Sequence, residues 1–196
     1  LITPDGGSAC VGGFDTRDQG DEVRRVIGVV PQAATSDPEL TASENVSFCA
    51  GLYRIPRRER GARVAAALDA VGLTERRGQL VGTLSGGMRR RVDIARGLVH
   101  QPSVLFLDEP TANLDPTSRT ALWDALKRLR DDRELTILLT THYMDEADRL
   151  CDRVAIMDSG TLMALDSPVN LKASIERTDV VDCSFSSNPS RWGVTL

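Results

Sequence analysis

The feature that most constrains the fold is a continuous apolar run, VLFL at residues 104–107, which is followed directly by Asp108 and Glu109. A run of strand length without a polar residue cannot alternate between core and solvent, so we expect both faces of this strand to be buried. Such burial is typical of parallel sheets that are covered by helices. Residues 136–139 (TILL) and 25–30 (RVIGVV) predict two further buried strands of the same kind.

Segments with helical patterns lie between these runs. Thr41 and Glu44 fit a capping box, in which Thr41 caps a helix and Glu44 reaches back to it. Residues 58–71 predict a second helix, and Gly72 is a natural stop for it. The side chains expected to face inward are Val46, Cys49 and Tyr53 (or Leu52) in the first helix, and Val64, Leu68 and Val71 in the second.

Two more helices and a hairpin follow. Residues 88–99 predict a helix whose apolar stripe is Met88, Val92, Ala95 and Val99, with Arg89, Arg90 and Arg91 off that stripe. Asp115 and Pro116 are typical of a helix start, as N-cap and first helical residue. The inward residues of that helix are expected to be Leu122, Leu126 and Leu129. Residues 153–157 and 161–165, joined by Asp-Ser-Gly, predict a β-hairpin.

Strands that alternate with helices over a chain of 196 residues indicate an α/β fold, with a mostly parallel central sheet flanked by helices. Ligands of such sheets bind outside the carboxyl ends of the strands. The residues that follow each predicted strand are therefore the first candidates for a functional site.

Polar side chains follow all three predicted strands. Asp108 and Glu109 come after residues 104–107, in the Walker B arrangement of P-loop NTPases, although a strand ending in a polar turn would look the same. The Asp108 carboxylate would supply an oxygen ligand to Mg²⁺, and Glu109 could act as a general base toward water. His142 follows the second strand, and Gln32 follows the third.

Ser85, Gly86 and Gly87 directly precede the helix predicted at residues 88–99. Glycines allow close approach of a ligand to the backbone, and the start of a helix offers free N–H groups to an anion. Ser85 could cap the helix and donate its hydroxyl to a phosphate. An ordinary Ser/Gly helix cap is the simpler alternative on local chemistry alone.

Together these segments resemble the nucleotide-binding domain of an ABC ATPase, a P-loop NTPase-like fold with an α-helical subdomain that carries the signature motif. The matching motifs follow the family's order: VVPQ ending at Gln32 resembles the Q-loop, LSGGM (84–88) the signature, VLFLDE (104–109) the Walker B motif, ANLD (112–115) the D-loop and TTH ending at His142 the switch histidine. The wording of MRRR (88–91) and THYMDEAD (141–148) resembles drug and antibiotic exporters of the daunorubicin-resistance type.

The resemblance implies a role for each matched residue. Gln32 would contact Mg²⁺ or the attacking water, and Asp108 would support the metal. Glu109 would be the general base, and His142 would bind the γ-phosphate of ATP. The residues that would act on the nucleotide of an opposite ATPase domain are Ser85, Gly86, Gly87 and Asp115.

One family motif does not occur: no G-x-x-x-x-G-K-[ST] pattern is present, and the only lysines are Lys127 and Lys172. Residues 4–15 resemble the segment that follows the P-loop helix, so we expect the P-loop to lie upstream of Leu1. Without it, residues 1–196 alone are expected to bind ATP poorly and to hydrolyse little of it.

Composition is ordinary for a globular domain, and the formal net charge of −4 gives no footprint for nucleic acid. The four cysteines form no C-x-x-C pair, so reduced thiols in a cytosolic setting are expected. No apolar run approaches the roughly 20 residues of a membrane span. With the resemblance to ABC ATPases, this implies a cytoplasmic protein that is peripheral on the inner face of the cell membrane.

The resemblance implies an ATPase domain at residues 1–175, with a helical subdomain at about 38–100, and the start of a C-terminal extension at 176–196, where residues 180–185 could form a strand. The implied partners are a transmembrane permease and a second ATPase domain. Phe48, Leu52, Tyr53 and Ile55 could line a groove for the permease, although core packing is the simpler interpretation of each. Two alternatives stay open: a degenerate half that lends only its signature motif, and a soluble ABC ATPase that acts on nucleic acid or ribosomes.

Overall fold

The computed structural model describes residues 4–132 and 135–174. Its elements fall into two units, residues 1–150 and 151–196, which are treated separately. The first unit contains β1 (Cys10–Val11), β2 (Phe14–Asp15), α1 (Gly20–Val26), β3 (Ile27–Val30), α2 (Ala42–Leu52), α3 (Arg57–Ala70), the 3-10 turns η1 (Thr74–Arg76) and η2 (Val81–Thr83), α4 (Gly86–Leu98), β4 (Val104–Asp108), α5 (Pro116–Asp132), β5 (Thr136–Thr140) and α6 (Met144–Leu150). The second contains β6 (Val154–Asp158), β7 (Thr161–Asp166) and α7 (Pro168–Ser174).

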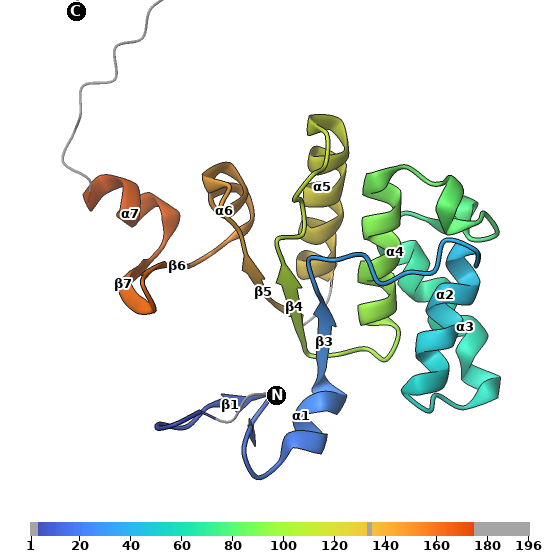
Figure 1. Ribbon diagram of the computed structural model, residues 1–196, viewed down its shortest axis with the longest axis horizontal. Helices are drawn as coiled ribbons and strands as arrows, with labels where there is room; N and C mark the ends of the chain where they lie inside the picture. The colour runs from blue at the N-terminus through green and yellow to red at the C-terminus, as the bar shows by residue number, and fades with distance from the viewer. Residues whose placement is uncertain (1–3, 133–134, 175–196) are drawn as a thin grey trace, which may run out of the picture. The chain divides into compact units, whose positions relative to one another are not determined.

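The central sheet of the first unit is parallel, in the order β3-β4-β5 (Figure 1). Its register aligns Val30 with Leu107 and Leu139, so the three strands end at one edge. Helices alternate with these strands along the chain. The predicted α/β fold with a parallel sheet and flanking helices is confirmed.

Helix α4 covers one face of this sheet. The contact is very close at Gly28, where a Cβ would meet the Gly97 carbonyl oxygen at 2.3 Å. Val30, Leu105 and Leu107 are buried on the same face. The opposite face is more open among the described residues, because Val29 and Leu138 are more than half exposed. The expectation that both faces of residues 104–107 and 136–139 are buried is therefore wrong for one face.

The first predicted strand is shorter than expected. Arg25 and Val26 end helix α1, and β3 begins only at Ile27. Asp21 and Glu22 in the first turn of α1, together with Arg24 and Arg25 in its last turn, suit the helix dipole. The apolar residues of RVIGVV do not indicate where α1 ends and β3 begins.

Helices α2, α3 and α4 form a helical region with its own core (Figure 1). Helix α2 begins with the predicted capping box: the Glu44 N–H donates to Thr41 Oγ1, and the Thr41 N–H donates to the Glu44 carboxylate. The predicted inward residues of α2 and α3 are buried, except at the end of α2. Leu52 and Tyr53 are exposed, at 66% and 41%, so that part of the prediction is wrong.

Helix α4 is the central helix of the first unit and contacts α2, α3, α5 and β3. It is therefore buried on more sides than one stripe predicts, and Ile94 and Leu98 are buried as well as Val92 and Ala95. The expectation that all three arginines lie off the buried surface is wrong for Arg90, which is only 8% exposed. The predicted inward residues of α5, Leu122, Leu126 and Leu129, are buried.

The second unit contains the predicted hairpin. Strands β6 and β7 are antiparallel, and Ser159 and Gly160 form a two-residue loop with φ of +48° and +79°. Positive φ at both positions matches the type I′ turn that favours tight hairpins. Residues 176–196, including the strand expected at 180–185, lie outside the described residues, and the predicted domain division stays a prediction. Among the described residues, no helix has the length and apolar character of a membrane span.

Candidate functional site

Three side chains predicted from separate strand ends meet at the carboxyl edge of the sheet. The Gln32 amide Nε2 donates to Glu109 Oε2 at 2.9 Å. His142 Nδ1 lies 3.2 Å from Glu109 Oε1. The two carboxylate oxygens of Glu109 are thus shared between residues that lie 77 and 33 positions away in the sequence (109 − 32 and 142 − 109). The side chains remain open to solvent, since those of His142 and Glu109 are 58% and 30% exposed.

Asp108 lies at the same edge, one residue before Glu109. Its Oδ1 accepts a hydrogen bond from Thr140 Oγ1 at 2.6 Å. Thr140 is the register partner of Asp108 on β5, and its hydroxyl and carbonyl oxygens both accept from the Glu109 N–H. Sequence reasoning missed Thr140, although its place at the end of the strand before His142 was a usable signal.

The backbone of Glu109 is unusual, with φ of +42° in the left-handed region. For an L-residue other than glycine this conformation costs roughly 1–2 kcal/mol, so the surrounding contacts must hold it. The hydrogen bonds from Glu109 N–H to Thr140 supply part of that support.

The Ser-Gly-Gly turn opens helix α4 as predicted. Ser85 Oγ accepts from the Met88 N–H at 3.3 Å, so Ser85 is the N-cap. Gly86 is open, since a Cβ there would meet only Leu114 at 3.7 Å. Gly87 differs: a Cβ would lie 2.7 Å from the Cβ of Ser118 on α5. The second glycine is therefore required by helix packing, whatever it does toward a ligand.

Asp115 lies near this turn, because the Ser118 that packs against Gly87 also contacts Asp115. The Ser118 N–H donates to Asp115 Oδ1 at 2.9 Å, which confirms Asp115 as the N-cap of α5. Hydrogen bonds from Ser118 lower the pKa of the Asp115 carboxyl, which favours its ionised form. The predicted nucleotide residues thus form two groups, one at the strand ends and one where α4 meets α5.

A comparison with known protein families identifies the family of this chain. The model of one family, described as ABC transporter, matches residues 1–112. The chain belongs to the ABC transporter family. Nucleotide binding is the activity that this family implies.

Curated relatives resemble this ABC domain over most of its length. The chain is 45% identical over 175 residues to the daunorubicin/doxorubicin resistance ATP-binding protein DrrA of Streptomyces peucetius, covering 89% of the chain and 53% of that protein. It is 36% identical over 186 residues to the linearmycin resistance ATP-binding protein LnrL of Bacillus subtilis (strain 168), covering 95% of the chain and 60% of that protein. The ABC domain thus spans little more than half the length of these relatives.

A solved structure agrees with the fold. CbiO1 of Clostridium perfringens, described as part of the ABC transporter complex cbiONQ, superposes with a TM-score of 0.79 at 30% sequence identity. The match covers 89% of this chain and 71% of that one.

The residues at the strand ends suit Mg²⁺, the metal that such a nucleotide site implies. Asp108 offers carboxylate oxygen, and the Gln32 amide, whose nitrogen faces Glu109, has its oxygen free of that contact. Among residues 4–132 and 135–174 no group of three or more His, Cys, Asp or Glu side chains could hold a metal by itself. The two donors Asp108 and Gln32 fit Mg²⁺, an ion that keeps several waters and binds phosphates with one or two protein ligands.

Proposed function

We propose that this chain is the ATP-binding and ATP-hydrolysing part of an ABC exporter, which powers efflux of a drug or antibiotic through a membrane partner. The observation that carries the proposal is the convergence of Gln32 and His142 on the Glu109 carboxylate. The names of the resistance proteins similar to it support the export of a drug or antibiotic.

In this proposal Glu109 is the general base that takes the proton from the attacking water. The contact with Gln32 holds its carboxylate at the strand edge. His142, which contacts the other carboxylate oxygen of Glu109, would bind the γ-phosphate. Asp108 and Gln32 would hold Mg²⁺, which when bound neutralises charge that develops on the phosphates. The hydrogen bond from Thr140 fixes the Asp108 carboxylate for that task.

The second group of residues would act on ATP held by another ATPase domain. Ser85, Gly86 and Gly87 open the 13-residue helix α4, whose first N–H groups attract an anion. Asp115, whose lowered pKa favours the ionised form, lies at the adjoining start of α5 and would work across the same interface. We therefore propose a second ATPase domain as a partner.

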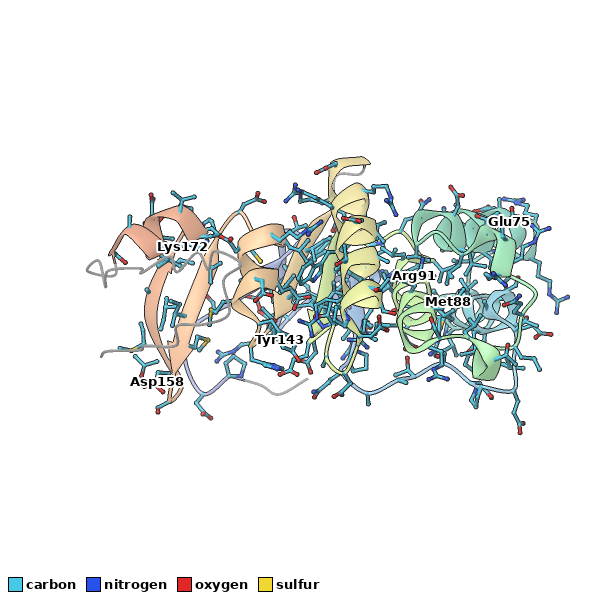
Figure 2. All side chains as sticks on the ribbon, turned by 90° about the horizontal axis from the view of Figure 1, so that it is seen from above. Glu75, Met88, Arg91, Tyr143, Asp158 and Lys172 are labelled. Atoms are coloured by element: carbon cyan, nitrogen blue, oxygen red, sulfur yellow. The ribbon has the colours of Figure 1, made fainter. Side chains whose placement is uncertain are left out.

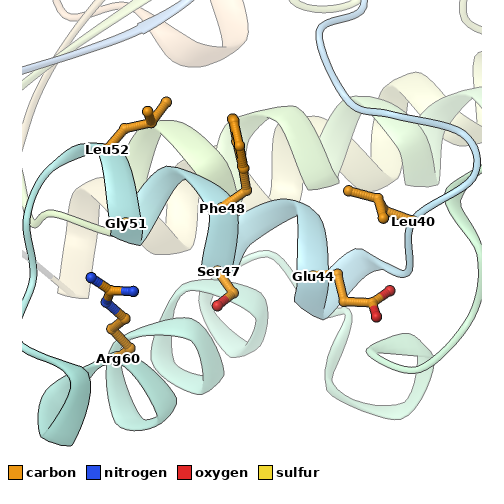
Figure 3. Close-up of a pocket in the computed structure, with 7 residues that line it drawn as sticks. All are labelled: Leu40, Glu44, Ser47, Phe48, Gly51, Leu52 and Arg60. Atoms are coloured by element: carbon orange, nitrogen blue, oxygen red, sulfur yellow. The ribbon is translucent and has the colours of Figure 1, made fainter.

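The other proposed partner is a transmembrane permease. An open groove of about 430 Å³ runs along α2 and is lined by Leu40, Glu44, Ser47, Phe48, Gly51, Leu52 and Arg60. Figure 3 shows the apolar side chains on one side of it and the charged ones on the other. Phe48 and Leu52 are 58% and 66% exposed, as an interface requires, whereas Ile55 is buried in the core.

The proposed place of action is the cytoplasmic face of the membrane, without a nucleic-acid partner. The ATPase domain would comprise residues 1–175, with the helical subdomain at about 38–100. Because the 196 residues contain no P-loop pattern, we expect them to turn over little ATP in isolation. Functional tests therefore use the full-length protein that the gene encodes.

The deciding experiment is Glu109→Gln in that protein. Loss of the general base should lower ATP turnover by about 100-fold or more while ATP binding is kept. The matched control is Glu75→Gln, an exposed glutamate on η1, the turn that follows α3 (Figure 2). Turnover that survives Glu109→Gln at the level of the control would contradict the proposal.

A further inference from the structure

Arg90 is the one arginine of the MRRR run whose guanidinium reaches the site, and its surroundings are specific. Its Nη1 donates to the Pro31 carbonyl at 2.6 Å, its Nη2 to the Asp108 carbonyl at 2.8 Å and its Nε to the Pro110 carbonyl at 3.0 Å. The residue is only 8% exposed. All three nitrogens of the planar guanidinium thus donate to backbone carbonyl oxygens. A lysine ammonium cannot reproduce this pattern.

The three acceptors frame the residues of the proposed catalytic edge. Pro31 directly precedes Gln32, whereas Asp108 and Pro110 stand on either side of Glu109. Since Arg90 draws the carbonyls on both sides of Glu109 to one group, it holds the peptide units around that residue. Glu109 has φ of +42°, a conformation that persists only where contacts over-determine it.

Arg90 also joins this edge to the signature turn. It lies on α4 five residues after Ser85, the N-cap of the same helix. Burial lowers the pKa of Arg90, and the nearby carboxylates of Asp93, Asp108 and Glu146 oppose that shift only in part. A buried guanidinium with three acceptors and nearby carboxylates is a fixed connection between α4 and the ends of β3 and β4.

We propose that Arg90 is a positioning residue for ATP hydrolysis, which sets the Glu109 carboxylate against Gln32 and ties both to the signature turn. This inference rests on the proposed function. Arg90 touches no nucleotide in it and acts through Glu109. A purely structural Arg90 would instead affect stability and leave the chemistry of folded protein unchanged.

The test uses Arg90→Lys and Arg90→Met in the full-length protein. Lysine keeps the charge with one point of contact. Methionine keeps a long apolar side chain but removes the charge and leaves the three carbonyl acceptors without a donor, so the stability of each variant is measured alongside its activity. Displacement of the base by about 1 Å can cost about 100-fold, so we expect kcat to fall about 10-fold in R90K and about 100-fold in R90M. The KM for ATP should change less than about threefold, since no binding contact is removed.

Arg91→Lys is the matched control. Arg91 is the next residue of α4, is half-buried and also donates to a backbone carbonyl, that of Val71 in the helical region, at 3.3 Å. Figure 2 labels it on α4. Because its partner is remote from Glu109, R91K should keep kcat within about twofold of the unchanged protein.

The decisive measurement repeats both Arg90 substitutions in a Glu109→Gln background. If Arg90 acts through Glu109, the second substitution should lower the residual turnover by less than about threefold. Full multiplication of the two losses, a wild-type kcat in folded R90K and R90M, or failure of both variants to fold would each overturn the proposal. Failure of the proposed function itself is recognised separately, by a Glu109→Gln protein that retains turnover.

Discussion

The helical region α2–α4 and the parallel sheet β3–β5 differ in how completely their apolar side chains are buried. In the helical region Val46, Val64 and Leu68 are at most 6% exposed, and the three helices cover one another. Among the described strand residues of the sheet, only the side chains of Val30, Leu105 and Leu107, on the face toward α4, are buried to that degree. Ile137 and Leu139 on the same face are half-buried. On the other face the aligned row of Val29, Phe106 and Leu138 is open or half-open in the described part of the chain.

The difference follows from how each element satisfies its backbone and its side chains. A helix closes its own hydrogen bonds and needs cover on one stripe, which two neighbouring helices supply. A parallel strand has two faces and depends on elements distant in the sequence to cover both. The same dependence brings the strand ends together, so Gln32, Asp108 and His142 meet at an edge that no local segment could build.

The largest difference in unfolding free energy between the two regions is expected from a pair of leucine truncations, which test this comparison. Leu68→Ala removes a side chain that is 1% exposed in the helical core, and should cost about 2–5 kcal/mol of unfolding free energy. Leu138→Ala, at a site that is 52% exposed on the open face, should cost less than about 0.5 kcal/mol. Urea denaturation of both variants measures the difference. Equal losses would mean that the open face is covered in solution and that the contrast between the regions is wrong.

A smaller effect is expected at two glycines, one in each region. Gly28→Ala would press a methyl group against the Gly97 carbonyl and Leu105, and should destabilise the fold by about 1–3 kcal/mol. Gly61→Ala is the matched change in the helical region, at an exposed position of α3 with no atom within 4 Å of the added Cβ. It should stabilise the protein by about 0.5–1 kcal/mol through helix propensity. Thermal unfolding gives both signs, and a neutral Gly28→Ala would show that the contact between α4 and β3 can yield.

The helix starts and the hairpin turn could be predicted from the sequence because their signals are local. The capping box of α2 needs only Thr41 and Glu44, which lie three residues apart. Asp115 caps α5 through the N–H of Ser118, three residues later. Ser159 and Gly160 form the hairpin turn by their own backbone conformation. The meeting of strand ends also followed, from the single rule that parallel strands finish at one edge.

Three features could not be predicted, and each depends on distant contacts. The end of α1 inside RVIGVV is invisible because Val26 and Ile27 are equally apolar. The burial of Arg90 depends on carbonyls 18, 20 and 59 residues away. The role of Gly87 in packing appears only once Ser118 lies beside it.

The smallest expected effect is on the pH dependence of the unfolding free energy. It concerns His100, which contacts both the helical region and the sheet. Its ring stacks on Tyr53 at the end of α2, with centroids 3.7 Å apart, and its Nε2 is 2.8 Å from the Ile27 carbonyl on β3. A carbonyl accepts only, so Nε2 carries the proton and Nδ1, which is buried without a partner among the described residues, does not. Burial lowers the pKa of His100 from its ordinary value of 6.5, and the bond to Ile27 opposes this only in part.

The sign of the pH dependence follows from that shift. Below about pH 6.5 the unfolded chain binds a proton at His100 that the folded protein resists, so this residue's contribution to stability is lost as the pH falls. His100→Gln can keep a donor for Ile27 and removes the titration. The free energy of unfolding, measured by urea from about pH 8 to about pH 5.5, should therefore fall less steeply in the variant. Parallel curves for the two proteins would mean that the ring opens to solvent, and that the junction between helical region and sheet is looser than either region alone.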